Sequence, residues 1–198
     1  MKNVIFDVGG VLLDWNPGRV LQSFYADANE RERMKQLIFH HADWLELDRG
    51  TMAEDVLLQR IGERAGRAVP ELSGLFEVVR DSLHPKQDTV ALLGSLSARG
   101  VPLYCLSNMP SKIYATLSQR FDFWQHFDGI VISGDIRMVK PEPAIFRHLL
   151  ERYGLRAGDT VFVDDLPANV EAAQRLGLHG VLFESAAQCE LALQSHVA

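Results

Sequence analysis

The feature that most constrains this fold is a series of five short apolar runs, with helical patterns between them. The runs cover residues 4–6, 102–106, 130–132, 161–163 and 180–183. Each run is almost wholly apolar rather than alternating, which is typical of strands buried on both faces of a parallel sheet. The helical patterns cover residues 87–98, 112–120, 143–153 and 169–176. This alternation predicts an α/β fold with a doubly wound, Rossmann-like parallel sheet.

One long segment interrupts the alternation. No strand is predicted between the first and second apolar runs, and the intervening residues read as consecutive helices. The expected helices cover residues 19–26, 30–39, 52–65 and 71–81. We therefore expect a core made of residues 1–14 and 84–198, with an inserted all-helical cap of residues 15–83.

Composition excludes several classes of protein. With 47% hydrophobic and 23% charged residues, the 198-residue chain can bury a sizeable core. Its 20 Lys and Arg against 26 Asp and Glu give a net charge of −6, which argues against a nucleic-acid or anionic-membrane partner. There is no long apolar span and no signal-peptide pattern. Cys105 and Cys189 have no metal-binding spacing, so we expect free thiols and a cytoplasmic location.

Polar residues stand where the predicted strands end. They are Asp7, Ser107, Asn108, Asp164 and Asp165, and Lys140 follows the third strand. Ligands of open parallel sheets bind outside the carboxyl ends of the strands, so we expect these side chains to converge at one edge. For most of them, capping of a following loop or helix is the alternative explanation. For Lys140 the alternative is an ordinary solvated side chain.

The adjacent carboxylates of Asp164 and Asp165 favour a metal ion. They repel each other in an apolar setting, and a hard divalent cation relieves that repulsion. Two or three carboxylates with water and phosphate oxygens describe a magnesium site. Gly9 and Gly10 would allow backbone amides to approach an anion, although their spacing differs from that of a dinucleotide-binding loop.

Together these residues resemble the four motifs of the haloacid dehalogenase superfamily. The matching segments are Phe6-Asp7-Val8-Gly9-Gly10-Val11-Leu12, Leu106-Ser107-Asn108, Lys140-Pro141-Glu142-Pro143 and Val161-Phe162-Val163-Asp164-Asp165-Leu166-Pro167-Ala168-Asn169. Their order, spacing and strand context agree along essentially the whole chain. The helical insert resembles the helical cap of this superfamily. The first motif is similar to that of a branch of small bacterial phosphatases, some of which act on sugar phosphates.

The resemblance implies a magnesium-dependent hydrolase of small phosphomonoesters, sugar phosphates among them, whose partner is a small phosphorylated metabolite. Asp7 would be the nucleophile that forms an aspartyl phosphate, assisted by Lys140. The implied metal ligands are Asp7, the backbone carbonyl of Gly9, Asp165 and, close by or through water, Asp164. The implied phosphate-binding residues are Ser107, Asn108, Gly9 and Gly10.

Gly9 departs from the usual pattern of the superfamily. Its phosphatases usually carry a second aspartate at this position, which acts as general acid and base. We therefore expect modest turnover, a good leaving group or an acid supplied from elsewhere, for which Asp14 is a candidate. The alternatives are a 2-haloacid dehalogenase, in which the same aspartate attacks carbon, and a weak or inactive binding protein of the same fold. Residues 44–50 are expected to form a cap-to-core contact or loop, with pocket lining as the alternative.

Overall fold

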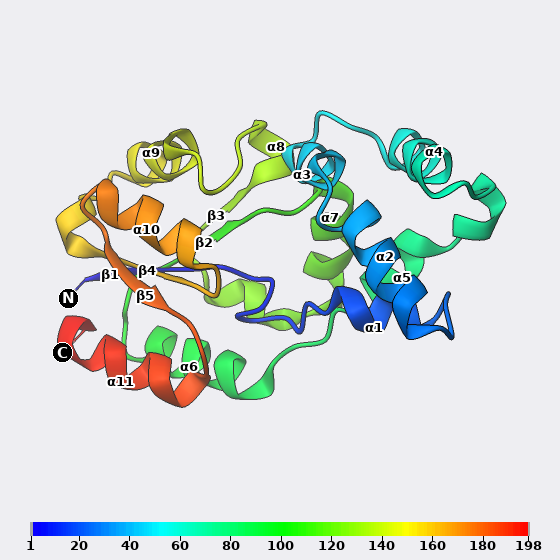
Figure 1. Cartoon of the computed structure of the whole chain (residues 1–198). Helices are drawn as coiled ribbons and strands as arrows, with labels where there is room; N and C mark the ends of the chain where they lie inside the picture. Colours follow the sequence, from blue (N-terminus) through cyan, green and yellow to red (C-terminus); the bar gives the residue numbers. More distant parts are fainter. Residues whose placement is uncertain (1, 198) are drawn as a thin grey trace.

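The computed structural model describes residues 2–197 and contains a five-stranded sheet (Figure 1). Its strands are β1 (Asn3–Phe6), β2 (Leu103–Ser107), β3 (Gly129–Ile132), β4 (Thr160–Asp164) and β5 (His179–Leu182). All neighbouring strands are parallel, in the order β3-β2-β1-β4-β5. The predicted strands and the doubly wound α/β class are therefore confirmed, and β1 lies at the centre of the sheet.

Helices cover both faces of the sheet (Figure 1). The covering helices are α6 (Gln87–Ala98), α7 (Ser111–Arg120), α9 (Pro143–Tyr153), α10 (Pro167–Arg175) and α11 (Ala186–Val197). In Figure 1, α9 and α10 lie over one face, and α6 and α11 lie over the other. Successive residues of β1 point to opposite faces, so Ile5 and Phe6 belong to different apolar clusters. This double burial explains why the strands read as continuous apolar runs.

A helical segment follows β1 and lies beyond the carboxyl ends of the strands (Figure 1). Its elements are α1 (Pro17–Gln22), α2 (Ala28–Ile38), α3 (Ala42–Arg49), α4 (Glu54–Ala65), a 3₁₀ helix (Val69–Leu72) and α5 (Leu75–Ser82). The four predicted helices correspond to α1, α2, α4 and α5, with ends shifted by a few residues. Between residues 2 and 197, no helix is long and apolar enough to cross a lipid bilayer.

The sequence did not predict α3, which lies where a loop or contact was expected. Its first turn is capped by His41, whose Nδ1 accepts a hydrogen bond from the Asp43 N–H at 3.1 Å. The helix ends at Gly50, which has the left-handed conformation that favours glycine. Trp44 and Leu47, three residues apart, are buried on one side of it. Short length and a histidine cap made this helix difficult to recognise from sequence.

The remaining connections are short. They are a 3₁₀ helix at Asp122–His126, the four-residue α8 (Ser133–Ile136) and a 3₁₀ helix at Ala157–Asp159. Of these, α8 directly follows β3 and packs against α3. The helical segment therefore touches the sheet domain at the edge where the predicted site residues lie.

Candidate active site

Asp7 directly follows the central strand β1 and is nearly buried. Its backbone N–H donates to the carbonyl of Val163 in β4 at 2.9 Å, which extends the strand pairing to this residue. The position of Asp7 is thus fixed by the sheet itself. The pKa of its carboxyl group is raised to about 7, mainly by burial. The positive charge of Lys140 lowers this pKa, and the negative charge of Asp164 raises it further.

Lys140 bridges two of the carboxylates. Its Nζ lies 2.7 Å from Oδ1 of Asp7 and 2.7 Å from Oδ2 of Asp164, and only 2% of the lysine is exposed. Burial alone would disfavour the ammonium, but the charges of Asp164 and Asp7 outweigh it and raise the pKa of Lys140. Lys140 is therefore a charged, immobilised cation rather than a solvated surface lysine.

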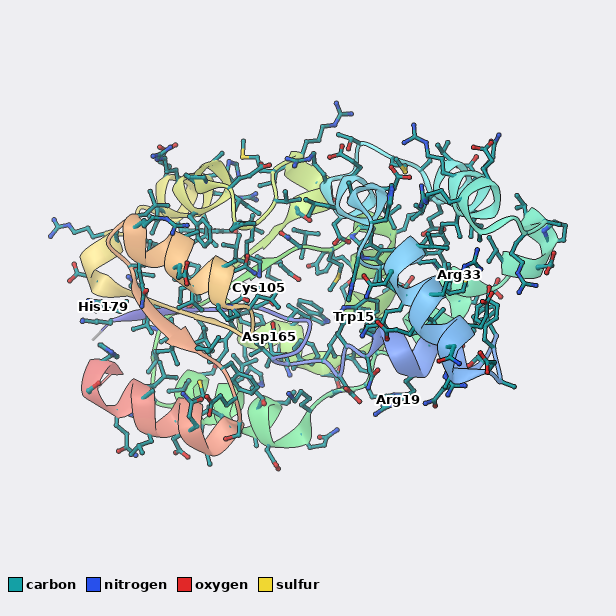
Figure 2. All side chains as sticks on the ribbon, viewed as in Figure 1. Trp15, Arg19, Arg33, Cys105, Asp165 and His179 are labelled. Carbon is teal, nitrogen blue, oxygen red and sulfur yellow. The ribbon has the colours of Figure 1, made fainter. Side chains whose placement is uncertain are left out.

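Asp164 is fully buried at the end of β4 and is held by several donors. Besides Lys140, it accepts from the backbone N–H of Leu166 at 2.8 Å and from the side-chain amide of Asn169 at 3.0 and 3.1 Å. Its oxygens are thus largely occupied by the protein. Asp165 is only partly buried, and Figure 2 shows it where the sheet meets the helical segment. Burial, and then the charge of Asp164, raise the pKa of Asp165.

The three carboxylates form a cluster that suits a hard cation. Asp7, Asp164 and Asp165 each offer an oxygen within 4.8 Å of the other two. One ammonium cannot neutralise three carboxylates, and the negative charge of Asp164 adds to burial in raising the pKa values of Asp7 and Asp165. An all-oxygen donor set with surplus negative charge fits a divalent ion such as magnesium.

Ser107 and Asn108 close β2 beside this cluster. The Asn108 side chain is bound to the backbone of Lys140: its Oδ1 accepts from the Lys140 N–H at 2.8 Å, and its Nδ2 donates to the Lys140 carbonyl at 2.9 Å. Asn108 therefore holds the lysine loop in place. Ser107 is buried, with 1% of its surface exposed.

Gly10 lies in the loop that follows Asp7. It has a φ of 77°, and an added Cβ would overlap the carboxylate of Asp165. Its N–H donates to the Leu13 carbonyl at 2.9 Å, and its own carbonyl accepts from Lys86 Nζ at 2.7 Å. The Gly10 N–H is thus used within the loop, and glycine is required here for close approach to Asp165.

Two neighbouring cavities open at this edge of the sheet. The carboxylate cavity is lined by Asp7, Lys140, Asp165, Pro141, Leu166, Ala168, Asn169 and, from the helical side, Pro17, Phe39, His40, His41, Ala42 and Leu45. The apolar cavity is lined by Leu13, Val79, Leu83, Met109, Pro110 and Ile113. Both are also lined by Gly9, Trp15, Trp44, Asp48 and Asn108, which therefore mark the boundary between them.

Aromatic rings form one wall of this boundary. Trp15 and Trp44 stack with their ring centroids 5.9 Å apart, and Phe39 packs edge-on against Trp44 at 4.6 Å. Trp15 precedes α1, Phe39 follows α2 and Trp44 lies in α3, so the cluster belongs to residues 15–83 and lies at their junction with the sheet domain. Figure 2 places Trp15 at this junction.

Asp48 lies within residues 44–50, for which pocket lining was the alternative expectation, but the sequence did not predict it as a site residue. It comes from the last turn of α3 and faces both cavities. Burial, and then the negative charge of Asp7, raise the pKa of its carboxyl group to about 8, against the charge of Lys140. Within residues 2–197, no hydrogen bond or ion pair holds this carboxyl group. Asp14, the acid considered from sequence, lies instead in an exposed ion pair with Arg19 at 2.5 Å and lines neither cavity.

Comparisons with known proteins agree with this description. The haloacid dehalogenase-like hydrolase family matches residues 1–177. Sesquiterpene phosphatase astK of Aspergillus oryzae is 32% identical over 189 residues, which cover 95% of this chain and 93% of that protein. Phosphoglycolate phosphatase of Yersinia pestis is 29% identical over 189 residues, covering 89% of this chain and 78% of that protein.

A solved structure shares the fold. It is that of the HAD family enzyme bt-2542 from Bacteroides thetaiotaomicron in complex with magnesium and inorganic phosphate. It aligns with a TM-score of 0.73 and 23% identity, and the alignment covers 93% of this chain and 94% of that chain. The common architecture therefore includes both the sheet and the helical segment.

Proposed function

Because this chain belongs to the haloacid dehalogenase-like hydrolase family, we propose that it is a magnesium-dependent phosphatase of small phosphomonoesters that works through an aspartyl phosphate on Asp7. The observation that carries this proposal is the buried Lys140 between Asp7 and Asp164, with Asp165 beside them at the same cavity. A fixed carboxylate, a fixed cation and surplus negative charge are what nucleophilic phosphoryl transfer with a divalent ion requires.

In the proposed reaction, a carboxylate oxygen of Asp7 attacks phosphorus and the bond from phosphorus to the alcohol oxygen breaks. Water then attacks the phosphorus of the aspartyl phosphate, which releases inorganic phosphate and restores the carboxylate. Lys140 holds Oδ1 of Asp7, which orients the carboxylate and offsets charge on the phosphoryl group. When bound, magnesium would withdraw charge from the phosphoryl oxygens.

The proposed magnesium ligands are Asp7, Asp165 and the backbone carbonyl of Gly9. Asp164 would act beside them, because its oxygens already accept from Lys140, Leu166 and Asn169. Ser107, the backbone around Gly9 and Gly10, and Asn108 would surround the phosphoryl group. For Asn108, the bonds to Lys140 favour an indirect contribution, through the position of the lysine.

We propose that residues 15–83 act as a cap over a core of residues 1–14 and 84–198, and that the apolar cavity receives the organic group of the substrate. Apart from Asp48 and Asn108, the side chains that line this cavity are apolar or tryptophan. Such a lining offers few partners for sugar hydroxyls, whose desolvation would then be uncompensated. An apolar alcohol is therefore favoured, in agreement with the name of the sesquiterpene phosphatase relative.

The test is phosphate release by the full chain, first treated with EDTA and then supplied with magnesium. The substrates are p-nitrophenyl phosphate, hexyl phosphate and glucose phosphates, and 2-chloropropionate tests halide release. We expect magnesium-dependent phosphate release that is lost in Asp7→Asn and kept in Asp135→Asn, a change at an exposed residue of α8. Halide release without magnesium, or no release from any phosphomonoester, would refute the proposal.

A further inference from the structure

Hydrolysis of an alkyl phosphate raises a problem that the groups around Asp7 do not solve. The departing alkoxide is a strong base, so a proton must reach its oxygen as the bond to phosphorus breaks. Asp7 is the proposed nucleophile, and Lys140 is committed to two carboxylates. Asp164 is fully buried among its donors and does not line the cavity. Asp165 is a proposed magnesium ligand.

Asp48 lies at the boundary between the two cavities. It is one of five residues shared by the carboxylate cavity and the apolar cavity. A phosphomonoester with its phosphoryl group at Asp7 and its organic group in the apolar cavity must place the bridging oxygen at this boundary. Of the five shared residues, only Asp48 has an ionisable side chain.

The end of α3 is fixed to the sheet domain at three consecutive residues. The carbonyl of Asp48 accepts from the hydroxyl of Ser133 at 2.5 Å. Arg49 donates to both carboxylate oxygens of Glu142, at 2.9 and 2.7 Å. Gly50 packs so closely on the carbonyl of Gly134 that an added Cβ would overlap it. The backbone at Asp48 is therefore tied to the sheet domain, although the residue belongs to the helical segment.

We propose that Asp48 is the proton-transfer residue of this site, an inference that rests on the phosphatase function proposed above. In the first step, the carboxylic acid of Asp48 gives its proton to the alcohol oxygen as that oxygen leaves phosphorus. In the second step, the resulting carboxylate takes a proton from the water that attacks the aspartyl phosphate. The acid is thereby restored, and the sum is phosphomonoester plus water giving alcohol plus phosphate.

Two further observations support this role. The Asp48 carboxyl group has no hydrogen-bond or ion-pair partner among the described residues, so none of them accepts its proton in a hydrogen bond. Its raised pKa is consistent with a carboxylic acid at neutral pH. The other titratable groups lining the carboxylate cavity are Asp7, Lys140 and Asp165 from the sheet domain and His40 and His41 from the helical segment.

The experiment compares leaving groups in Asp48→Asn. Nitrophenolate leaves without a proton, whereas an alkoxide does not. With p-nitrophenyl phosphate, the variant should release one nitrophenolate per enzyme at close to the wild-type rate and then turn over slowly, because water attack lacks its base. With hexyl phosphate, the first step itself should slow by about 10²- to 10⁴-fold. Asp48→Ser, which is smaller, should give the same pattern.

Asp135→Asn is the matched control, and its kinetics should equal those of the wild type. Equal losses for both leaving groups in the first step, or an unchanged rate with hexyl phosphate, would overturn the role of Asp48. A wild-type enzyme that releases no nitrophenolate and carries no phosphate on Asp7 would instead overturn the proposed function. The two failures are therefore distinguishable.

Discussion

The carboxylates on the two sides of the cavity differ in their hydrogen-bond and ion-pair partners. At the sheet edge, Asp164 is satisfied by Lys140, Asn169 and a backbone N–H. In the helical segment, α3 carries a buried carboxylate, Asp43, and a partly buried one, Asp48. Asp43 is paired with Arg60 at 3.1 Å and with Arg64, and these partners lower its pKa. Asp48 has no such partner among residues 2–197, and its pKa is raised. Within α3, the paired carboxylate Asp43 is structural, and Asp48, which has no partner among the described residues, faces the cavity. At the sheet edge, by contrast, Asp7 faces the cavity and is paired with Lys140.

The largest effect expected from this comparison is that of removing the central cation. Lys140→Met keeps the size of the side chain but leaves Asp7 and Asp164 buried without their common partner. We expect a loss of about 3–5 kcal/mol in the free energy of unfolding, measured by urea titration without magnesium. Adding Asp164→Asn to this variant should restore part of the loss. Lys112→Met on the exposed side of α7 is the control. An equal loss of stability in that variant would show that the effect does not depend on the pairing of Lys140 with Asp7 and Asp164.

The second largest loss of stability is expected when the ion pairs of Asp43 are weakened. Asp43→Asn weakens two charged hydrogen bonds that tie α3 to α4, so we expect a loss of about 1.5–3 kcal/mol in the same titration. Asp48→Asn should cost nothing measurable, although both residues lie in one short helix. Glu63→Gln, an exposed change in α4, is the control. Equal losses at Asp43 and Asp48 would remove the distinction between the two carboxylates.

The pH dependence of stability also distinguishes Asp48 from the paired carboxylate Asp43. A carboxyl group whose pKa rises from 3.8 when unfolded to about 8 when folded binds its proton more tightly in the folded state. Its contribution to the free energy of unfolding is therefore fully present below pH 4 and is lost as the pH rises towards 8. The melting temperature of the metal-free protein should fall between pH 5 and pH 9, since Asp7 and Asp165 are shifted in the same direction.

Comparing Asp48→Asn with the wild type measures how much of this pH-dependent fall in melting temperature is due to Asp48. Asp48 is partly exposed to the cavity, so we expect a share of only about 1 kcal/mol, or ~2–4 °C in a domain of this size. The melting curve of the variant should therefore be shallower than that of the wild type across this pH range. Parallel curves would show that Asp48 ionises as it does in the unfolded chain.

The smallest expected effect concerns the apolar cavity. Val79→Thr keeps the shape of a lining side chain but adds a hydroxyl group, which should lower kcat/KM for hexyl phosphate by about 3- to 10-fold. The kcat/KM for glucose phosphates should change less. Val78→Thr, at a neighbouring residue outside the cavity, is the matched control. An unchanged kcat/KM for hexyl phosphate would place the organic group elsewhere.

The sheet edge was accessible from sequence because most of its polar residues end an apolar strand or directly follow one, with Lys140 as the exception. Asp7, Asn108 and Asp164 could be placed together because each stands at the carboxyl end of a strand in a predicted parallel sheet. Asp48 offered no such signal, because its position depends on the contacts of Ser133, Glu142 and Gly134 with the end of α3. Contacts of this kind join distant parts of the chain, and local patterns do not encode them.

The order of strands in the sheet also has a consequence for biosynthesis. The central strand β1 is made first, but its partners β2 and β4 begin only at Leu103 and Thr160. At about 5–20 residues per second, an emerging apolar strand must wait ~5–20 s for its first partner. The helices between β1 and β2 are complete well before that moment. On the ribosome, the helical segment is therefore synthesised in full before β1 can pair with another strand.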